Sequence, residues 1–176
     1  MSYNILITGG AGYLGSTMVP EFLADGHKVT VLDNFMFNQA SLNHCCFHPN
    51  FKIVKGDIRQ KNTMTQLMKS ADVIIPLAAL VGAPLCSLDP VGATTTNHDA
   101  IELMMSLLSQ DQIVLMPTTN SAYGTGDKDN YCNEDSPLRP ISQYAIEKVE
   151  IEKKLMQHSN AISFRLATVF GMSPRM

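Results

Sequence analysis

The segment ILITGGAGYLG, residues 5–15, constrains the fold of this chain more strongly than any other part of the sequence. It begins with a short aliphatic run, breaks into glycines at Gly9, Gly12 and Gly15, and leads directly into residues with helical spacing of apolar side chains. This order predicts a buried strand, a tight turn and the start of a helix. Glycines permit backbone angles at such a turn that a Cβ forbids, and they let the main chain approach a ligand closely.

The N–H groups at the start of such a helix are free to bind phosphate, and the helix dipole favours negative charge there. Glycine spacing alone is a weak indication, because glycines also cluster in ordinary turns. Asp33, however, follows Gly15 by 18 residues, and a carboxylate about 20 residues beyond such a turn accepts the ribose hydroxyls of a dinucleotide. The context therefore predicts dinucleotide binding. Since no arginine stands beside Asp33, NAD is favoured over NADP.

The composition describes one globular domain. The 176 residues are 45% hydrophobic and 16% charged, and the net charge is −3 without any run of Lys or Arg. A nucleic-acid-binding surface is therefore not expected. The longest apolar run, residues 73–85, is broken by Pro76 and Pro84 and is too short to span a bilayer. The N-terminus shows no basic segment followed by an apolar one, so we expect a cytoplasmic protein without a membrane partner.

The cysteines indicate reduced thiols rather than disulfides or a metal site. They are Cys45, Cys46, Cys86 and Cys132, and none forms a Cys-x-x-Cys pair. This low density fits the cytosol better than a disulfide scaffold. His44 and His48 flank the adjacent pair, but neighbouring cysteines lack the ligand spacing of a tetrahedral metal site. We therefore expect a surface loop here and no bound metal.

Strand and helix patterns alternate along the whole chain. Strands are predicted at residues 4–8, 28–32, 51–55, 73–78, 113–118 and 161–169, and helices at 13–25, 62–70, 91–109 and 142–158. This alternation is typical of right-handed crossovers, and it predicts a Rossmann-type, doubly wound parallel sheet in a three-layer α/β/α domain. Residues 124–140 form a long polar connection, and loops of this length are usually functional or mobile.

Ligands in such a sheet bind beyond the carboxyl ends of the strands. The second predicted strand leads into Asp33 and Asn34, and the third is followed by Asp57, which can accept a hydrogen bond from an adenine amino group. The fourth leads into Ala78 and Ala79, small residues against which a cofactor can lie. Asp33 and Asp57 are also suited to capping a helix or turn, and this alternative stays open for both.

Tyr144 and Lys148 lie four residues apart and share one face of the last predicted helix. A phenol titrates near ~10, too high for a base at neutral pH, and a nearby cation favours its ionised form. Lys148 can also hold ribose hydroxyls, while Thr119, at the end of the preceding strand, supplies a hydroxyl to the same site. The alternative is a tyrosine in the hydrophobic core, because Tyr-x-x-x-Lys often occurs by chance.

Together these motifs resemble the extended short-chain dehydrogenase/reductase family, specifically its NAD-dependent nucleotide-sugar epimerases and dehydratases. The shared pattern covers essentially the whole chain. It comprises Thr8-Gly9-x-x-Gly12-x-x-Gly15, Asp33-Asn34, Gly56-Asp57, Leu77-Ala78-Ala79, Asn97, Thr119-x-x-x-Tyr123-Gly124, Tyr144-x-x-x-Lys148 and Arg165-x-x-x-x-x-Gly171. Within the family, residues 75–86, 120–124 and 136–142 look most like bacterial GDP-heptose 4-dehydrogenases, enzymes of surface polysaccharide synthesis.

The resemblance implies that Tyr144, Lys148 and Thr119 are catalytic and that Asn97 supports the backbone. The cofactor site that it implies consists of Gly9, Gly12, Tyr13, Leu14, Gly15, Asp33, Asn34, Asp57, Ile58, Leu77, Ala78, Ala79, Thr118, Tyr144, Lys148, Ala167 and Val169. The implied activity is NAD-dependent oxidation at carbon 4 of a nucleotide sugar, with a 4-epimerase or dehydratase as the alternative. A non-catalytic NAD-binding module, or an inactive cofactor-domain fragment, is the alternative of another class.

Three features depart from the family pattern. Pro76 stands where the family often has histidine, and Thr168 stands where epimerases commonly have an asparagine that holds the sugar nucleotide. The family's smaller, substrate-binding lobe would follow residue 176, so residues 1–176 are expected to be the NAD-binding domain. The resemblance also implies a homodimer through helices 91–109 and 142–158, which carry more apolar residues than one contact needs. Neighbouring loops that cover this surplus are the alternative.

Overall fold

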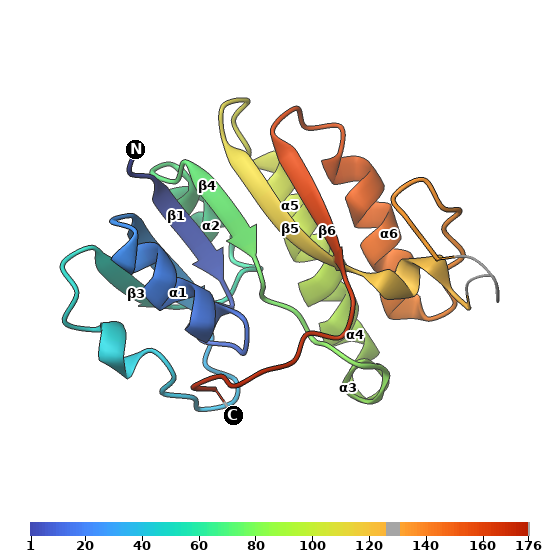
Figure 1. Cartoon of the computed structure of the whole chain (residues 1–176), viewed down its shortest axis with the longest axis horizontal. Coiled ribbons are helices and arrows are strands. Elements are labelled where there is room, and N and C mark those ends of the chain that lie inside the picture. Colours follow the sequence, from blue (N-terminus) through green and yellow to red (C-terminus); the bar gives the residue numbers. More distant parts are fainter. Residues whose placement is uncertain (126–130, 176) are drawn as a thin grey trace.

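The computed structural model describes residues 1–125 and 131–175, and it confirms the predicted doubly wound fold (Figure 1). Six parallel strands form one sheet in the order β3-β2-β1-β4-β5-β6. The strands are β1 (Asn4–Thr8), β2 (Lys28–Asp33), β3 (Phe51–Lys55), β4 (Val73–Pro76), β5 (Ile113–Thr119) and β6 (Ala161–Leu166). The strand order reverses between β1 and β4, the point at which sheets of this kind form a ligand crevice.

Helices cover the two faces of the sheet. One face carries α1 (Gly15–Ala24), and the other carries α2 (Lys61–Met68), α5 (Ala100–Ser106) and α6 (Gln143–Leu155), as Figure 1 shows. The shorter elements are α3 (Ala83–Leu88), α4 (Pro90–Thr94), the π-helical turn η2 (Thr95–Asp99) and the 3-10 turns η1 (Asn43–Cys45) and η3 (Asn120–Tyr123). The chain after β6 crosses the carboxyl ends of the strands toward α1 (Figure 1).

Two hydrophobic cores hold the three layers together. Ile7 packs with Val19 of α1 in one core, while Leu6, its neighbour in β1, packs with Met104 and Ile151 in the other. This division follows from the alternation of side chains along a strand. All four residues of β4 are buried, which agrees with a central strand that has helices on both sides.

The observed strands match the predicted ones closely except at the ends of β4 and β6. β4 stops at Pro76, and the chain then turns toward the glycine segment, with the Leu77 N–H still bonded to the Thr8 carbonyl at 2.9 Å. β6 stops at Leu166, which pairs with Thr119 at the end of β5. Because β5 offers no further backbone beyond that point, the predicted extension of β6 to residue 169 is wrong.

The predicted helix at 91–109 is a helical run from Pro90 to Ser106 that contains the π turn η2. Buried Asn97 lies in this turn; its Oδ1 accepts from the Leu80 N–H at 2.8 Å and its Nδ2 donates to the Leu80 carbonyl at 2.9 Å. Asn97 therefore fixes the backbone after β4, which confirms its predicted structural role. The short helix α3, in a run rich in Gly and Pro, is not anticipated by the sequence pattern.

Several loop and surface predictions can be compared with the described residues. The predicted loop 124–140 has no helix or strand at 124–125 and 131–140, and residues 126–130 lie outside the described residues. Cys45 is the last residue of the turn η1 and is buried, in contrast to the predicted surface loop, and all four cysteines are free thiols. No helix in the described part of the chain combines the length and the apolar character needed to cross a membrane.

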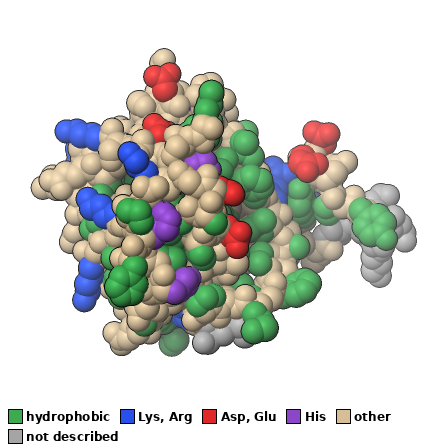
Figure 2. All heavy atoms as spheres, turned by 60° about the vertical axis from the view of Figure 1, so that its left-hand side comes forward, with side chains coloured by type: hydrophobic (Ala, Val, Ile, Leu, Met, Phe, Trp, Pro, Cys, Tyr) green, Lys and Arg blue, Asp and Glu red, His purple; other side chains and the backbone are tan. Residues whose placement is uncertain are grey.

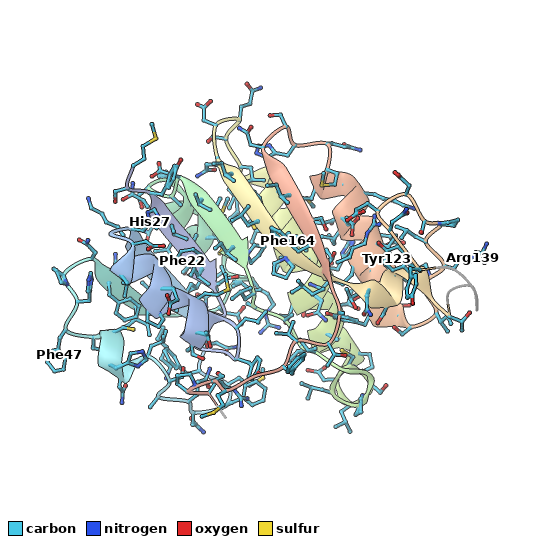
Figure 3. The ribbon with its side chains drawn as sticks, viewed as in Figure 1. Phe22, His27, Phe47, Tyr123, Arg139 and Phe164 are labelled. Carbon is cyan, nitrogen blue, oxygen red and sulfur yellow. The ribbon has the colours of Figure 1, made fainter. Side chains whose placement is uncertain are left out.

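Strands β5 and β6 are uncovered on the side of α1, as far as the described residues show. Leu115 and Pro117 of β5 pair in register with Ile162 and Phe164 of β6. The last two side chains are 51% and 44% exposed, and Figure 3 marks Phe164 on this open side. Figure 2 brings the other half of the molecule forward, where hydrophobic side chains are interspersed with polar and charged ones.

Candidate functional site

The turn between β1 and α1 has a shape that only glycine permits. Gly9 has a φ of +67°, and a Cβ there would lie 2.6 Å from the Cα and N atoms of Ala78. A Cβ on Gly15 would collide with the backbone of Gly10. The first glycine thus allows the left-handed conformation and the approach of β4, and the third allows helix and turn to pack.

A cavity of about 540 Å³ opens beside this turn, beyond the carboxyl ends of β1, β2, β3 and β4. Most of the predicted cofactor residues line it. They are Gly9, Gly12, Tyr13, Leu14, Gly15, Asp33, Asn34, Asp57, Ile58, Leu77, Ala78 and Ala79. The structure therefore brings together, in one cavity, residues from four separate strand ends.

Asp33 is buried and its carboxylate is held by the backbone. Oδ2 accepts from the Ala11 N–H at 3.0 Å, and Oδ1 accepts from the Phe35 N–H at 2.8 Å. Asp33 thereby joins the glycine turn to the chain after β2, as the capping alternative expects. It also lines the cavity, so its structural role and a contact with a ligand are compatible.

Asp57 is engaged by Arg59, a residue that the sequence analysis did not single out. Arg59 donates from Nε to Oδ1 at 3.0 Å and from Nη2 to Oδ2 at 2.6 Å. These hydrogen bonds hold the pKa of Asp57 below its usual value. Arg59 also donates to Thr95 Oγ1 at 3.2 Å and lines the same cavity. An adenine amino group that contacts Asp57, as predicted, would therefore share the Asp57 carboxylate with Arg59.

Tyr144 and Lys148 lie on α6, and neither lines the cavity described above. Lys148 Nζ is 5.8 Å from the centre of the Tyr144 ring. Burial lowers the pKa of Lys148 to about 8, although Glu147 opposes this shift. Burial also raises the pKa of Tyr144, with the nearby Cys86 thiol adding to the rise. The sequence predicts a lowered Tyr144 pKa; in this structure, burial and Cys86 raise it instead.

The side chain of Lys148 is largely buried, and its ammonium group has donors to offer a polar ligand. Lys148 is only 4% exposed, yet Nζ donates no hydrogen bond to any residue in the described ranges. Its neighbour Glu147 is satisfied by Thr94 Oγ1 at 2.7 Å and by Gln143 Nε2 at 3.1 Å. A buried cation with unused donors is costly unless an acceptor arrives, and ribose hydroxyls would supply acceptors.

Thr119 and Thr118 end β5 but face different surroundings. Thr119 is partly exposed, and its Oγ1 accepts from the Ser121 N–H at 3.1 Å at the start of η3. Thr118 is buried, and its hydroxyl lies 3.1 Å from Glu152 Oε2 and 3.2 Å from the Phe164 carbonyl. Because that hydroxyl is used inside the protein, the structure does not place the predicted cofactor residue Thr118 at the cavity.

Ala167 and Val169 do not line the cavity either. Both are exposed residues in the segment after β6. Their prediction as cofactor residues came from the resemblance to the family. Several residues that line the cavity were not among those predicted, including Arg59, Gln39 and Arg175. Gln39 Nε2 lies 3.4 Å from Asp33 Oδ1. Arg175 is far from the glycine turn in sequence, so no local motif marks it.

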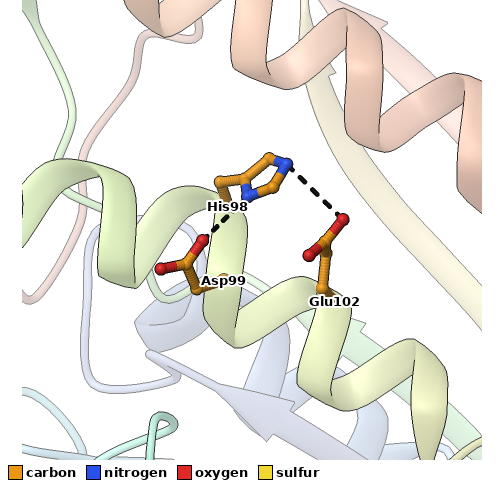
Figure 4. A group of neighbouring side chains, drawn as sticks. All are labelled: His98, Asp99 and Glu102. Atoms are coloured by element: carbon orange, nitrogen blue, oxygen red, sulfur yellow. Dashed lines mark hydrogen bonds and ion pairs between the residues drawn. The ribbon is translucent and has the colours of Figure 1, made fainter.

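A separate group of possible metal ligands lies at the surface of η2 and α5. His98, Asp99 and Glu102 place one ligand atom each within 4.8 Å of one another (Figure 4). Glu102 also forms an ion pair with Lys154 of α6, whose hydrogen bond lowers the pKa of that carboxyl. An ammonium at Glu102 competes with a metal cation for the same carboxylate, so we interpret the group as an ion-pair link between α5 and α6.

Comparisons with known proteins match this arrangement. The chain is 33% identical over 127 residues to the UDP-N-acetyl-alpha-D-glucosaminuronate decarboxylase of Bacillus cytotoxicus. This match covers 72% of this chain and 39% of that protein. It is 33% identical over 160 residues to the UDP-glucose 4-epimerase of Mycolicibacterium smegmatis, with coverages of 88% and 51%. The chain thus spans about half the length, or less, of these relatives.

Solved structures agree with the sequence matches. The Bordetella bronchiseptica enzyme WbmG, in complex with NAD and UDP, superposes with a TM-score of 0.83 and is 27% identical, covering 97% of this chain and 55% of that one. The family model described as "NAD dependent epimerase/dehydratase family" matches residues 5–176. The chain belongs to the NAD-dependent epimerase/dehydratase family, and its predicted cofactor, NAD, is the cofactor of that family.

Proposed function

We propose that this chain is the NAD-binding part of an enzyme that oxidises a nucleotide sugar at carbon 4. One observation carries the proposal: the cavity beside the glycine turn and the Tyr144–Lys148 pair are joined by the same short helices. Leu85 of α3 lines the cavity, while the next residue, Cys86, is close enough to Tyr144 to affect its pKa. Thr96 of η2 lines the cavity, and Thr94, just before it, bonds to Glu147 of α6.

Different cavity residues would hold different parts of the cofactor. Backbone N–H groups at the start of α1 would face the diphosphate. Asp33 would accept the hydroxyls of one ribose, and Ala78 and Ala79 leave room for the cofactor against β4. Lys148, with its unused donors, would hold the hydroxyls of the other ribose. When bound, NAD supplies a hydride acceptor and a positive ring beside Tyr144.

Tyr144 would accept the proton of a sugar hydroxyl, helped by Lys148 and Thr119. With a pKa of about 8, Lys148 is predominantly charged at neutral pH, and a cation near a phenol favours its ionised form. Thr119 Oγ1 would hydrogen-bond the reacting oxygen. In the reverse direction, Tyr144 would return the proton to the ketone oxygen.

The substrate and the fate of the keto product remain parts of the proposal. A GDP-heptose is the substrate that segments 75–86, 120–124 and 136–142 favour, whereas the two relatives described above carry the names of UDP-sugar enzymes. Release of the ketone would make the enzyme a 4-dehydrogenase, and return of the hydride to the opposite face would make it a 4-epimerase. Mass spectrometry of the products formed from GDP-heptose and UDP-sugars separates these outcomes.

Replacement of Tyr144 tests the catalytic assignment. In the full-length protein, Tyr144→Phe is expected to abolish hydride transfer while NAD stays bound, because the ring remains and only the hydroxyl is lost. The matched control is Tyr131→Phe, since Tyr131 is fully exposed. Turnover that is unchanged in Tyr144→Phe would favour the non-catalytic NAD-binding module instead. Turnover that is absent from the wild-type 176-residue chain, with NAD bound, would favour the inactive cofactor domain.

Two further proposals concern the whole protein. The first is that residues 1–176 are the cofactor domain of a longer chain with a substrate lobe, which the coverage of the relatives and the uncovered face of β5 and β6 support. The second is a homodimer through α5 and α6. Most of the apolar residues that favoured it, including Ile101, Met104 and Ile151, are buried within one chain. The interface would therefore use exposed polar residues, and sedimentation equilibrium distinguishes dimer from monomer.

A further inference from the structure

Arg175 reaches the cavity although it lies 160 residues beyond the glycine turn in sequence. Three side-chain hydrogen bonds hold the segment before it against the start of α1. Tyr13 OH donates to the Gly171 carbonyl at 2.5 Å, and Ser173 Oγ lies 2.9 Å from Ser16 Oγ and 3.1 Å from the Tyr13 carbonyl, to which it donates. The path of this segment can be followed in Figure 1. Ser173 is therefore fixed at the first turn of α1, and Arg175 follows two residues later.

The Arg175 guanidinium lies over the Phe37 ring at 4.8 Å, on the loop that follows Asp33. Arg175 lines the same cavity as Gly12 and Asp33. The side chain is only partly exposed, so the guanidinium is placed by packing rather than extended into solvent. It thus stands between the glycine turn and the loop after β2.

Arg175 differs from the other ionised side chains of this cavity in having no polar partner. Asp33 accepts from two backbone N–H groups, Asp57 is paired with Arg59, and Asp89 accepts from the Gly92 N–H at 2.9 Å at the start of α4. In the ranges 1–125 and 131–175, no carboxylate pairs with the Arg175 guanidinium and no oxygen accepts its hydrogen bonds. Its positive charge is therefore available to an anion.

We infer that Arg175 binds the diphosphate of the dinucleotide, in addition to the backbone N–H groups of the glycine turn. This inference rests on the proposed function, that is, on NAD binding in this cavity. The cavity lining carries three carboxylates and two arginines, and one arginine is neutralised by Asp57. A dianionic group entering near Asp33 and Asp89 needs a full positive charge close by, and a planar guanidinium binds phosphate oxygens in a fixed, two-pronged geometry.

The experiment compares the affinities of adenosine, AMP, ADP, NAD and NADP for the purified wild-type protein, Arg175→Gln, Arg175→Lys and the control Lys69→Gln. Lys69 is an exposed cation at the end of α2, away from the cavity. Arg175→Gln is expected to weaken NAD and ADP binding by roughly 10- to 100-fold and to leave adenosine binding unchanged, because only a charge-assisted hydrogen bond is lost. Arg175→Lys should restore part of the loss, and the salt dependence of NAD binding should fall in Arg175→Gln.

Equal NAD affinity in wild type and Arg175→Gln would overturn the inference, as would an equal loss of adenosine and ADP affinity, which would indicate packing on Phe37 instead. A loss confined to NADP would place the guanidinium at the ribose 2′ position and would overturn it too. Circular dichroism of each variant checks that the fold is retained. If wild type binds no NAD, the proposed function itself fails. If wild type binds NAD and the variant is unaffected, only the role of Arg175 fails.

Discussion

At the scale of single residues, the proposed chemistry would depend on Lys148, a lysine that the fold largely buries. Lys148 is 4% exposed, and burial lowers its pKa from 10.5 to about 8. A shift of this size costs the folded protein roughly 3 kcal/mol whenever the lysine is charged. Such a cost is common where a side chain is placed for function rather than for stability. The unused donors of Lys148 are thus a property of the site, and a bound ribose would recover part of the cost.

The cost of burying Lys148 predicts how stability changes with pH. Between pH 8 and 10.5 the unfolded chain binds the lysine proton and the folded chain releases it, so the free energy of unfolding rises with pH. Below pH 8 both states are protonated and the full cost is present. We expect wild type to gain roughly 2 kcal/mol relative to Lys148→Met between pH 7 and 9.5. Urea denaturation at the two pH values measures this, and a constant difference would contradict it.

At the scale of elements, the turn from β1 to α1 combines a left-handed residue with a close backbone contact. Gly9 and Gly26 both have positive φ, +67° and +82° respectively. A Cβ on Gly9 would lie 2.6 Å from the backbone of Ala78, whereas a Cβ on Gly26 would meet no atom within 4 Å. The turn after α1 therefore needs glycine for conformation alone, and the turn before α1 needs it for conformation and for space.

This difference predicts two outcomes for the same substitution. Gly26→Ala should lower the free energy of unfolding by roughly 1–2 kcal/mol, the cost of a left-handed alanine, and should leave NAD binding intact. Gly9→Ala should cost several kcal/mol more and should abolish NAD binding, because β4 or the turn has to move. Thermal unfolding and calorimetric titration with NAD measure both effects. Equal destabilisation by the two variants would show that the contact with Ala78 is not rigid.

At the scale of the whole molecule, strands β5 and β6 differ from the rest of the sheet, because the helices that the structure describes cover only one of their two faces. Behind β5 and β6, Glu152 of α6 accepts from Arg165 of β6 at 2.6 and 2.9 Å, and Arg165 also donates to Tyr123 OH at 3.0 Å. This network holds α6, and with it Tyr144 and Lys148, against the last two strands. In front of the same strands, Ile162 and Phe164 are uncovered.

The uncovered face predicts that the 176-residue chain associates through it. Replacing both Ile162 and Phe164 by Lys should remove association that grows with concentration, because neighbouring exposed apolar side chains on the edge strand β6 form a surface that favours association. Phe47→Lys is the control, since Phe47 is a singly exposed aromatic on the other half of the molecule. Sedimentation velocity at increasing concentration is the measurement. If both variants sediment like wild type, this face is not an association surface.

Local signals in the sequence were sufficient for the sheet and for about half of the residues that line the cavity. The aliphatic runs, the glycine turn, and the acidic or small residues at four strand ends all lie within a few residues of the elements that position them. Predictions failed where a residue's role depends on neighbours far along the chain. The Thr118 hydroxyl donates to the Glu152 carboxylate, and β6 ends where its pairing with β5 ends.

The sequence by itself determined the parallel sheet, the glycine turn and the pairing of Tyr144 with Lys148 on one helix face, because these depend on periodicity and on backbone sterics within short segments. Only the tertiary structure decided the charge balance of the cavity. It carried Arg175 to the start of α1 and buried Lys148 so deeply that its pKa falls. Burial and electrostatic pairing are set by which residues meet in space, and spacing along the chain does not determine that.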